Sequence, residues 1–327
     1  MDPVSWGLLS TARINGAVIN GARASELADV VAVASRDGER ARNYAERFGI
    51  PRAHASYEAL LADPDVDAVY VSLPNGLHVE WTIRALEAGK HVLCEKPMDR
   101  RPAAVARAFD VAEREGLVLS EAFMWRHNPQ CKRLQELLAE DAIGDVRLVR
   151  ACFSFPLAAG AVNVRLDAAL DGGGLLDVGS YCVSGARLAT GGEPVSALGS
   201  AVTGPSGVDT RFTGMLRFEG DVLATFDCGI DLPNRHELEI VGSRGRIVLA
   251  DPWHCRAPLI AIERDGTAAV IELEPADSYR LELEDMAAAI AGERPPLLGR
   301  ADALGQARAL AALELSAAEE RAVAVQR

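Results

Sequence analysis

Lys96 lies in a short stretch, HVLCEKPM (residues 91–98), whose order of residue types suits a side chain that works on a ligand. Residues 91–94 begin this stretch as an apolar run that predicts a buried strand. Pro97 ends such a strand because it has no N–H to donate, and it pushes the preceding residue toward an extended backbone. The sequence therefore predicts that Lys96 is held at a strand tip with a defined direction.

A second stretch, GGGLLDVGSYCV (residues 172–183), carries an acid and a phenol four residues apart. That spacing places Asp177 and Tyr181 on one face if the segment is helical. A phenol is a weak base, and a nearby ammonium group favours its ionised form. Lys96 could supply that charge if two domains meet over a cleft. The alternative is a core tyrosine whose hydroxyl bonds Asp177.

The loop after the first predicted strand could hold the phosphates of a dinucleotide. The usual fingerprint is G-x-G-x-x-G, and this chain has Ser10, Ala12 and Asn15 at the three glycine positions. The first two are small, so a backbone could still approach a pyrophosphate at the helix N-terminus. The alternative is an ordinary strand–helix turn. The cofactor candidates in this loop are Ser10, Thr11, Ala12, Arg13 and Ile14.

The end of the second predicted strand favours NADP(H) over NAD(H). A site that prefers NAD usually has an acid at this tip to bind the ribose 2′-hydroxyl, but here Ser35 and Arg36 occupy it. Arg36 could bind a 2′-phosphate through its guanidinium, with Arg40 assisting from one turn later. NAD(H) is retained as an alternative cofactor. The opposing interpretation is a pair of solvated arginines that open a helix.

The six histidines show no spacing typical of metal ligands, so the sequence predicts no metal site. His54 in a loop and His91 at a strand start are interpreted as structural residues. His78, near the start of a helix, is kept as a candidate on the cofactor side. The six cysteines are scattered without a C-x-x-C pair, which is typical of reduced thiols in a cytoplasmic protein.

Length and charge exclude several classes of protein. The chain has 327 residues and a formal net charge of −13. Such a charge disfavours nucleic acid or an anionic membrane as a partner, because both need a basic face. No apolar run approaches the roughly 18 residues of a membrane span, and the N-terminus has no signal segment. We expect a protein of the cytoplasm that acts on a small molecule.

These candidates need elements to position them, and the first third of the chain alternates strand and helix signals. Apolar runs predict strands at 4–9, 30–34, 66–73, 91–94 and 117–119, and helical patterns lie at 36–48, 57–61 and 77–88. Asn75 is predicted to cap the last of these helices. Such alternation implies right-handed crossovers and a parallel sheet, which binds ligands at the carboxyl ends of its strands. Residues 1–123 are therefore predicted to form a dinucleotide-binding domain.

After about residue 145 the pattern changes to strands separated by turns. Two helical segments, 279–291 and 301–320, close the chain, and residues 124–327 are predicted to form a second domain for substrate binding and oligomerisation. Its strand-like segments predict one large antiparallel sheet. They lie at 145–155, 195–202, 210–218, 222–228, 237–241, 246–249, 259–263 and 268–273.

Six pieces, in order, resemble the glucose–fructose oxidoreductase, inositol dehydrogenase and MocA family along nearly the whole chain. They are WGLLSTARIN, VASRDGERA, DAVYVSLPNGLHVEW, AGKHVLCEKPM, EAFMWRHNP and GGGLLDVGSY. The last two look most like the branch of D-xylose and trans-dihydrodiol dehydrogenases, and antibiotic-pathway sugar 3-ketoreductases are also similar. The resemblance implies an α/β Rossmann domain followed by an α+β domain with a large open, mostly antiparallel sheet. The replacement of all three fingerprint glycines departs from the family pattern.

The resemblance also implies roles for single residues. Lys96 would stand beside nicotinamide and substrate, with a cis peptide to Pro97. Tyr181 would be the proton donor or acceptor, and Asp177 its helix neighbour. Arg126 and Arg165 fall on segments that border the site in relatives. The remaining cofactor-side candidates are Leu73, Pro74, Asn75, His78, Glu95, Lys96 and Arg126. The substrate-side candidates are Lys96, Arg126, Arg165, Asp177 and Tyr181.

Together these features predict an NADP(H)-dependent oxidoreductase that transfers hydride between nicotinamide and a hydroxyl or carbonyl group of a sugar or polyol. The alternative is a non-catalytic NADP-binding sensor or regulator on the same fold, and the presence of Lys96, Asp177 and Tyr181 argues against it. A third interpretation, hydrolysis through a transient oxidation, is typical of distant relatives with histidine-rich loops, which this sequence lacks.

The resemblance places the oligomer interface on the second domain's sheet, so we expect a homodimer or homotetramer. That domain has too few predicted helices to cover both faces of the sheet. The sequence predicts that its apolar positions lie on an uncovered face, which another subunit would bury. The residues assigned to that face are Leu216, Phe218, Leu223 and Phe226.

Overall fold

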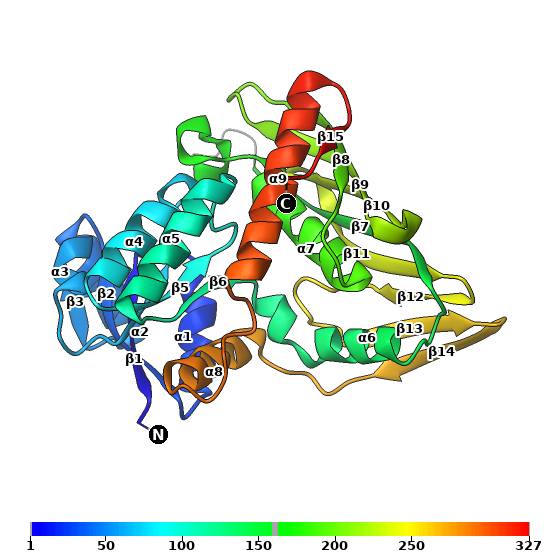
Figure 1. Ribbon diagram of the computed structural model, residues 1–327. Coiled ribbons are helices and arrows are strands. Elements are labelled where there is room, and N and C mark those ends of the chain that lie inside the picture. Colours follow the sequence, from blue (N-terminus) through cyan, green and yellow to red (C-terminus); the bar gives the residue numbers. More distant parts are fainter. Residues whose placement is uncertain (1, 159–162, 327) are drawn as a thin grey trace. The chain divides into compact units, whose positions relative to one another are not determined.

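The computed structural model describes residues 2–158 and 163–326. The chain folds into two compact units, coloured by sequence in Figure 1. Unit 1 comprises residues 1–127 and 277–304, and unit 2 comprises residues 128–276 and 305–327. The first unit is therefore built from two separate stretches of chain, where the sequence predicted a single boundary after residue 123.

Unit 1 is built on a six-stranded parallel sheet with the order β3-β2-β1-β4-β5-β6. Its two central strands are β1 and β4, and all four residues of β4 are buried because helices lie on both faces of the sheet. This confirms the predicted Rossmann-type fold. The strands are β1 (Val4–Leu9), β2 (Ala28–Ala34), β3 (Arg52–His54), β4 (Ala68–Val71), β5 (His91–Glu95) and β6 (Leu119–Ala122).

Six α-helices accompany this sheet among the described residues of unit 1. Helix α1 packs against α8, and α4 packs against α5. Asp37 is the N-cap of helix α2, and its side chain accepts the Glu39 and Arg40 N–H groups. Gly49 ends the helix with a φ of 66°, a left-handed conformation that glycine tolerates. The helices are α1 (Asn15–Arg23), α2 (Gly38–Phe48), α3 (Tyr57–Leu61), α4 (His78–Glu87), α5 (Pro102–Glu115) and α8 (Ser278–Ile290).

Helix α8 belongs to unit 1, although the sequence predicted it in the second domain. Leu283, Met286 and Ala287 are buried in the same core as Trp6 and Val18. The apolar periodicity of the sequence predicts this helix. It cannot tell whether the helix packs in the core of the first or of the second domain, because both cores offer apolar partners. Helix α9 (Arg300–Glu319) starts in unit 1 and continues in unit 2.

The start of α4 also differs from the prediction. Asn75 lies inside a short 3-10 helix, η1 (Asn75–Leu77), and the residue before α4 is Leu77, which offers no capping side chain. The 3-10 turn takes the place of the expected cap, because its hydrogen bonds satisfy backbone groups at the N-terminus of the helix. The predicted cis peptide between Lys96 and Pro97 is confirmed.

Unit 2 is built on a nine-stranded sheet with the order β14-β13-β12-β11-β7-β10-β9-β8-β15. It is mostly antiparallel, as predicted, but β7 and β10 pair in parallel. The strands are β7 (Val146–Pro156), β8 (Ser196–Thr203), β9 (Asp209–Arg217), β10 (Leu223–Gly229), β11 (Asp231–Gly242), β12 (Gly245–Leu249), β13 (Leu259–Arg264), β14 (Thr267–Glu272) and β15 (Val323–Ala324).

One face of this sheet is covered by helix. Helix α7 (Ser180–Thr190) packs on β7, β10 and β11, and α6 (Pro129–Ala139) lies near β13. Leu216, Phe218 and Phe226 point to the covered side and are only 0%, 3% and 4% exposed. Their assignment to an uncovered face was therefore wrong, since a period of two fixes which residues share a face but not which face is covered.

The other side is here called the open face of the sheet. Leu198 and Met215 lie on it and are 38% and 37% exposed, and Arg150 forms an ion pair there with Glu239. One row of register partners crosses it from β8 to β14. That row is Leu198, Met215, Thr225, Arg150, Glu239, Val248, Ala261 and Val270.

The six cysteines, all among the described residues, are free, as the sequence predicted. Within residues 2–158 and 163–326, no helix combines the length and apolar character needed to cross a membrane.

Candidate active site

The carboxyl edge of the unit 1 sheet collects most of the predicted cofactor residues. The strand order reverses direction between β1 and β4, so the loops that follow these two strands leave in opposite directions. Ligands of open parallel sheets bind in the crevice at such a switch point. Ser10 follows β1 and its hydroxyl lies 2.9 Å from that of Ser72, which follows β4. The predicted site therefore coincides with the switch point.

Ser10 adopts the backbone conformation that a fingerprint glycine would. Its φ is 134°, a region that side chains rarely enter. Local hydrogen bonds hold it there: Ser10 Oγ donates to the Ser72 carbonyl at 3.0 Å, and Asn15 Nδ2 donates to the Ser10 carbonyl at 2.8 Å. Helix α1 then begins without a side-chain cap from any described residue. This loop resembles a phosphate-binding turn built with serine in place of glycine.

The end of β2 carries a pair of exposed guanidinium groups. Ser35 is buried and its hydroxyl accepts a hydrogen bond from the Asp37 N–H at 3.2 Å, whereas Arg36 and Arg40 are exposed. Both arginines act on Tyr57: burial raises the pKa of its phenol, while Arg36 and Arg40 lower it. The two guanidinium groups therefore gather beside one side chain at this tip.

His78 connects the loops after β4 and β5. Its side chain is buried, with Nε2 at 2.7 Å from the Leu73 carbonyl and Nδ1 at 2.8 Å from the Pro97 carbonyl. Burial lowers its pKa, while the two carbonyl groups and Glu95 act in the opposite direction. The imidazole thus holds the residues that flank Pro74 and Lys96 in fixed positions. Its placement among backbone carbonyls makes it a support for the candidate site.

Lys96 lies directly beyond the end of β5, as predicted, and is partly exposed. Its N–H donates to Glu95 Oε2 at 3.2 Å, and the Tyr70 hydroxyl donates to Glu95 Oε1. Below them Glu282 is buried, and burial, with Glu95 and Asp285, raises its pKa well above the usual range. The backbone of Lys96 is therefore held by Glu95, and sequence reasoning missed the nearby Glu282 because it lies on α8, far along the chain.

Arg126 lies in a short 3-10 helix, η2 (Met124–His127), that follows β6. Its Nη1 lies 3.4 Å from Asp302 Oδ1, and its guanidinium carbon is 5.8 Å from the centre of the Trp125 ring. The side chain is mostly buried. This placement keeps the guanidinium in unit 1, near the end of the sheet that carries the other cofactor candidates.

In unit 2, the glycine run 172–174 has a clear steric cause. A Cβ on Gly172 would lie 2.5 Å from the Arg165 carbonyl oxygen, and one on Gly173 would lie 2.1 Å from Asp209 Oδ1. Gly173 also has a φ of 125°. Asp209, which the sequence did not single out, accepts a hydrogen bond from the Leu175 N–H at 2.7 Å. The glycines therefore let the chain pass closely between two carbonyl or carboxylate groups.

Asp177 and Tyr181 follow this turn on different types of helix. Asp177 lies in a π-helix, η5 (Leu175–Gly179), and Tyr181 in the first turn of α7. The Asp177 carboxylate accepts a bond from Arg165 Nε at 2.5 Å, which brings two predicted substrate residues together. A π-turn inside a helix is often found at functional sites.

An aromatic wall surrounds Tyr181. Tyr181 is 9% exposed, and its ring packs edge-on against Phe153, with ring centres 5.2 Å apart, and at a tilt against Trp253, with ring centres 5.9 Å apart. Sequence reasoning missed both partners, because a phenylalanine in a strand and a tryptophan in a loop are usually core residues. Lys96 belongs to unit 1, and Asp177, Arg165 and Tyr181 belong to unit 2.

Comparison with known proteins identifies both parts of the chain. The model of the "Oxidoreductase family, NAD-binding Rossmann fold" matches residues 9–123, and that of the "GFO/IDH/MocA C-terminal domain" matches residues 131–248. D-xylose 1-dehydrogenase (NADP(+)) 2 from Haloferax volcanii is 39% identical over 97% of this chain and 98% of its own length. The dTDP-3,4-didehydro-2,6-dideoxy-alpha-D-glucose 3-reductase of Actinomadura kijaniata is 34% identical over 97% and 96%.

Solved structures show the same similarity. A crystal structure of the 3-ketoreductase from Actinomadura kijaniata with NADP and TDP-benzene superposes with a TM-score of 0.90, at 32% identity, over 96% of this chain and 98% of that one. The aldose-aldose oxidoreductase from Caulobacter crescentus, complexed with glycerol, has a TM-score of 0.91 at 28% identity, over 98% and 99%. Because the family models cover most of the chain and these relatives match it from end to end, the protein belongs to the GFO/IDH/MocA family of oxidoreductases.

Proposed function

We propose that the protein is an NADP(H)-dependent oxidoreductase that transfers hydride between nicotinamide and a CH–OH or carbonyl group of a sugar or sugar-like molecule. The observation that carries this proposal is the end-to-end similarity to an NADP(+)-dependent D-xylose dehydrogenase. An NADP complex of a structural neighbour supports the same cofactor class. The protein's own residues then have to account for binding, orientation and proton transfer.

The residues at the carboxyl edge of the unit 1 sheet suit NADP(H). In the turn that leads into α1, the N–H groups of Arg13 and Ile14 have no acceptor among the described residues and suit a pyrophosphate. The exposed guanidinium groups of Arg36 and Arg40 suit a 2′-phosphate. Pro74 and Asn75 follow β4 beside the same edge. When bound, the cofactor supplies the hydride acceptor or donor.

Proton transfer is assigned to Tyr181. Its hydroxyl would take the proton from a substrate hydroxyl during oxidation and return it to a carbonyl oxygen during reduction. The ammonium group of Lys96 would stabilise the negative charge that develops on these oxygens. The Asp177–Arg165 pair would bind neighbouring substrate hydroxyls, since a carboxylate accepts and a guanidinium donates hydrogen bonds. Arg126 is assigned to binding of both the cofactor and the substrate.

The direct test measures turnover of nucleotide with a panel of sugars. Oxidation of D-xylose and other aldoses with NADP⁺, and reduction of keto sugars with NADPH, should reveal at least one substrate. Tyr181→Phe should keep NADPH binding while lowering kcat by roughly 10²–10⁴-fold, the usual contribution of a general acid or base. Lys96→Met should lower kcat by a comparable factor.

Thr190→Val provides a control for the loss of a hydroxyl, because Thr190 lies at the end of α7 away from Tyr181 and its hydroxyl donates to the Ala186 carbonyl at 2.9 Å. Its kcat should equal that of the wild type. A protein that binds NADPH tightly but turns over none of the sugars would support the alternative, a non-catalytic NADP-binding sensor. Normal turnover by Tyr181→Phe would assign the proton to another residue, with Asp177 the first to examine.

A further inference from the structure

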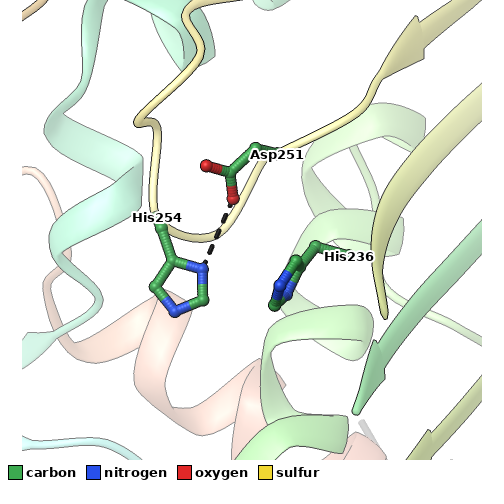
Figure 2. A group of neighbouring side chains, drawn as sticks. All are labelled: His236, Asp251 and His254. Carbon is green, nitrogen blue, oxygen red and sulfur yellow. Dashed lines mark ion pairs between the residues drawn. The ribbon is translucent and has the colours of Figure 1, made fainter. Parts of the chain in front are cut away.

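Two histidines and an aspartate converge in unit 2 at a place that the proposed function does not use. His236 comes from β11, whereas Asp251 and His254 come from the loop between β12 and β13. Figure 2 shows the three side chains turned toward one another. One donor atom from each lies within 4.8 Å of the others. All three are partly buried, so the cluster is neither a solvated surface group nor part of the apolar core.

Two polar atoms of these side chains lack hydrogen-bond partners among the described residues. Asp251 Oδ2 accepts the Arg256 N–H at 3.0 Å, but Oδ1 is buried and has no hydrogen-bond partner among the described residues. Its nearest cation is His254 Nδ1 at 3.4 Å, an ion pair only if the imidazole is protonated. His236 Nδ1 is likewise buried without a hydrogen bond from the described parts of the chain. Buried polar atoms without partners are costly, so these atoms are expected to bind an ion or an ordered water.

The surrounding structure holds these side chains in place. Both imidazole rings pack edge-on against Phe153, with ring centres 5.3 and 5.4 Å away, and against each other at 4.8 Å. Trp253, between Asp251 and His254, anchors the loop by donating its Nε1–H to the Cys152 carbonyl at 2.9 Å. The donors are therefore positioned by a strand and by a loop that is tied back to the sheet, which is how a preorganised site is built.

We propose that His236, Asp251 and His254 bind one divalent first-row transition-metal ion, with Zn²⁺ the best match. Two imidazoles and one carboxylate are typical zinc ligands, and three protein ligands leave a fourth position for water. In a tetrahedral site, donors at about 2.1 Å from the ion lie about 3.4 Å apart, so a pair at 4.8 Å needs to close by roughly 1.4 Å. Rotation of His254 on its loop can supply that movement, because its side chain is 29% exposed.

The sequence predicted no metal site, because these three residues share no recognisable spacing. Asp251 and His254 are only three residues apart, but the third donor lies on another strand, 15 positions before Asp251. Pairing of β11 with β12 is what brings them together. Both histidines contact Phe153, which also contacts Tyr181. The bound ion would therefore lie on the same aromatic wall as the candidate catalytic tyrosine, but its binding does not depend on the proposed function.

The test uses full-length protein without a polyhistidine tag, freed of metal by a chelator and dialysis. Titration with Co²⁺ should produce the visible absorption of a nitrogen- and oxygen-coordinated ion, without sulfur charge transfer, and saturate at one ion per chain. Zn²⁺ should displace the Co²⁺ and raise the Tm. His236→Ala, Asp251→Asn and His254→Ala should each weaken binding by at least about 10–100-fold.

His54→Gln is the matched control, since His54 pairs with Asp63 at 3.0 Å in unit 1 without a third donor beside it among the described residues. Its Co²⁺ spectrum should equal that of the wild type. Asp251→Asn preserves side-chain shape, so a folded Asp251→Asn protein keeps the test decisive even if a histidine variant misfolds. The proposal is overturned if the wild type shows no saturable binding, or if any folded variant of the three binds Co²⁺ as the wild type does.

Discussion

At the residue scale, the proposed preference for NADP(H) rests on the side chains at the tip of β2. Arg36 is exposed, and the residue before it, Ser35, is a buried hydroxyl where NAD-specific proteins usually carry an acid. A charge-assisted contact to a 2′-phosphate is worth about 1.5–3 kcal/mol, which corresponds to roughly ten- to a hundredfold in affinity. The proposed preference for NADP(H) therefore depends on very few residues.

We expect Arg36→Ala to weaken NADPH binding roughly ten- to a hundredfold and to leave NADH binding nearly unchanged. Fluorescence titration of both cofactors measures this directly. Arg114→Ala is the control, because Arg114 is an exposed arginine on α5 that pairs with Glu115. Equal affinity of the wild type for NADPH and NADH would count against the assignment.

Ser10 tests whether the loop keeps the geometry of a glycine turn. Ser10→Ala and Ser10→Gly both remove the hydrogen bonds to Ser72, but a φ of 134° strains only alanine, because glycine has no Cβ. Strain of this kind costs about 1–3 kcal/mol. We expect Ser10→Ala to unfold at a lower urea concentration than Ser10→Gly. This is the reverse of the usual order, in which alanine is more stable than glycine. A Ser10→Ala protein as stable as Ser10→Gly would show that the backbone strain is absent.

At the scale of elements, the turn into α7 depends on Asp209. Its carboxylate on β9 faces Gly173 and accepts the Leu175 N–H, and burial raises its pKa to about 6, an effect that the Leu175 hydrogen bond opposes. In the unfolded chain the ordinary value is 3.8. Between these values the folded state binds the proton and the unfolded state does not. The free energy of unfolding therefore falls as pH rises through this range.

The comparison of wild type with Asp209→Asn isolates this group, because an amide does not titrate. From pH 7 down to pH 4.5, the wild type should gain stability relative to the variant. The gain is at most about 3 kcal/mol, from roughly two pH units at 1.4 kcal/mol each. Urea unfolding at several pH values measures it. Asp265→Asn, in the exposed β13–β14 turn, should show no such trend, and a pH-independent difference at Asp209 would contradict the prediction.

The elements themselves were largely predictable, and the exceptions have physical causes. β1 and α3 begin and end where the sequence placed them, because apolar runs and capping residues mark their ends. β3 and β15 have three and two residues, too short to produce a periodic signal. The parallel pairing of β7 with β10 was missed because alternation predicts strands but not their order.

The candidate site was predictable in part for a related reason. Lys96 and Tyr181 stand in short motifs, so their positions can be found without a structure. Their supports, such as Glu282, Asp209 and Phe153, come from distant parts of the chain and enter only through folding. The three proposed metal ligands are the extreme case, because each residue taken alone is an ordinary polar side chain.

At the scale of the whole molecule, the open face of the unit 2 sheet decides whether copies associate. Its central part is ionic, with Arg150 and Arg246 both paired to Glu239, and Arg246 also paired to Glu263. Apolar side chains lie toward both ends of the register row, including Leu198, Met215 and Val270. Apolar ends around an ionic centre can match a second copy turned by 180°, which is the symmetry of most homodimers.

We therefore expect a homodimer or a dimer of dimers that uses this face, held by apolar contacts and weakened by salt because of its charged centre. Sedimentation velocity at micromolar protein should show a species larger than the monomer. Met215→Glu should shift it toward the monomer with little loss of folding stability, since an exposed substitution usually changes stability by less than about 0.5 kcal/mol. Leu315→Glu controls for added charge, because Leu315 is 46% exposed on α9, away from this face. A monomeric wild type, or equal dissociation of the two variants, would rule out assembly through the open face.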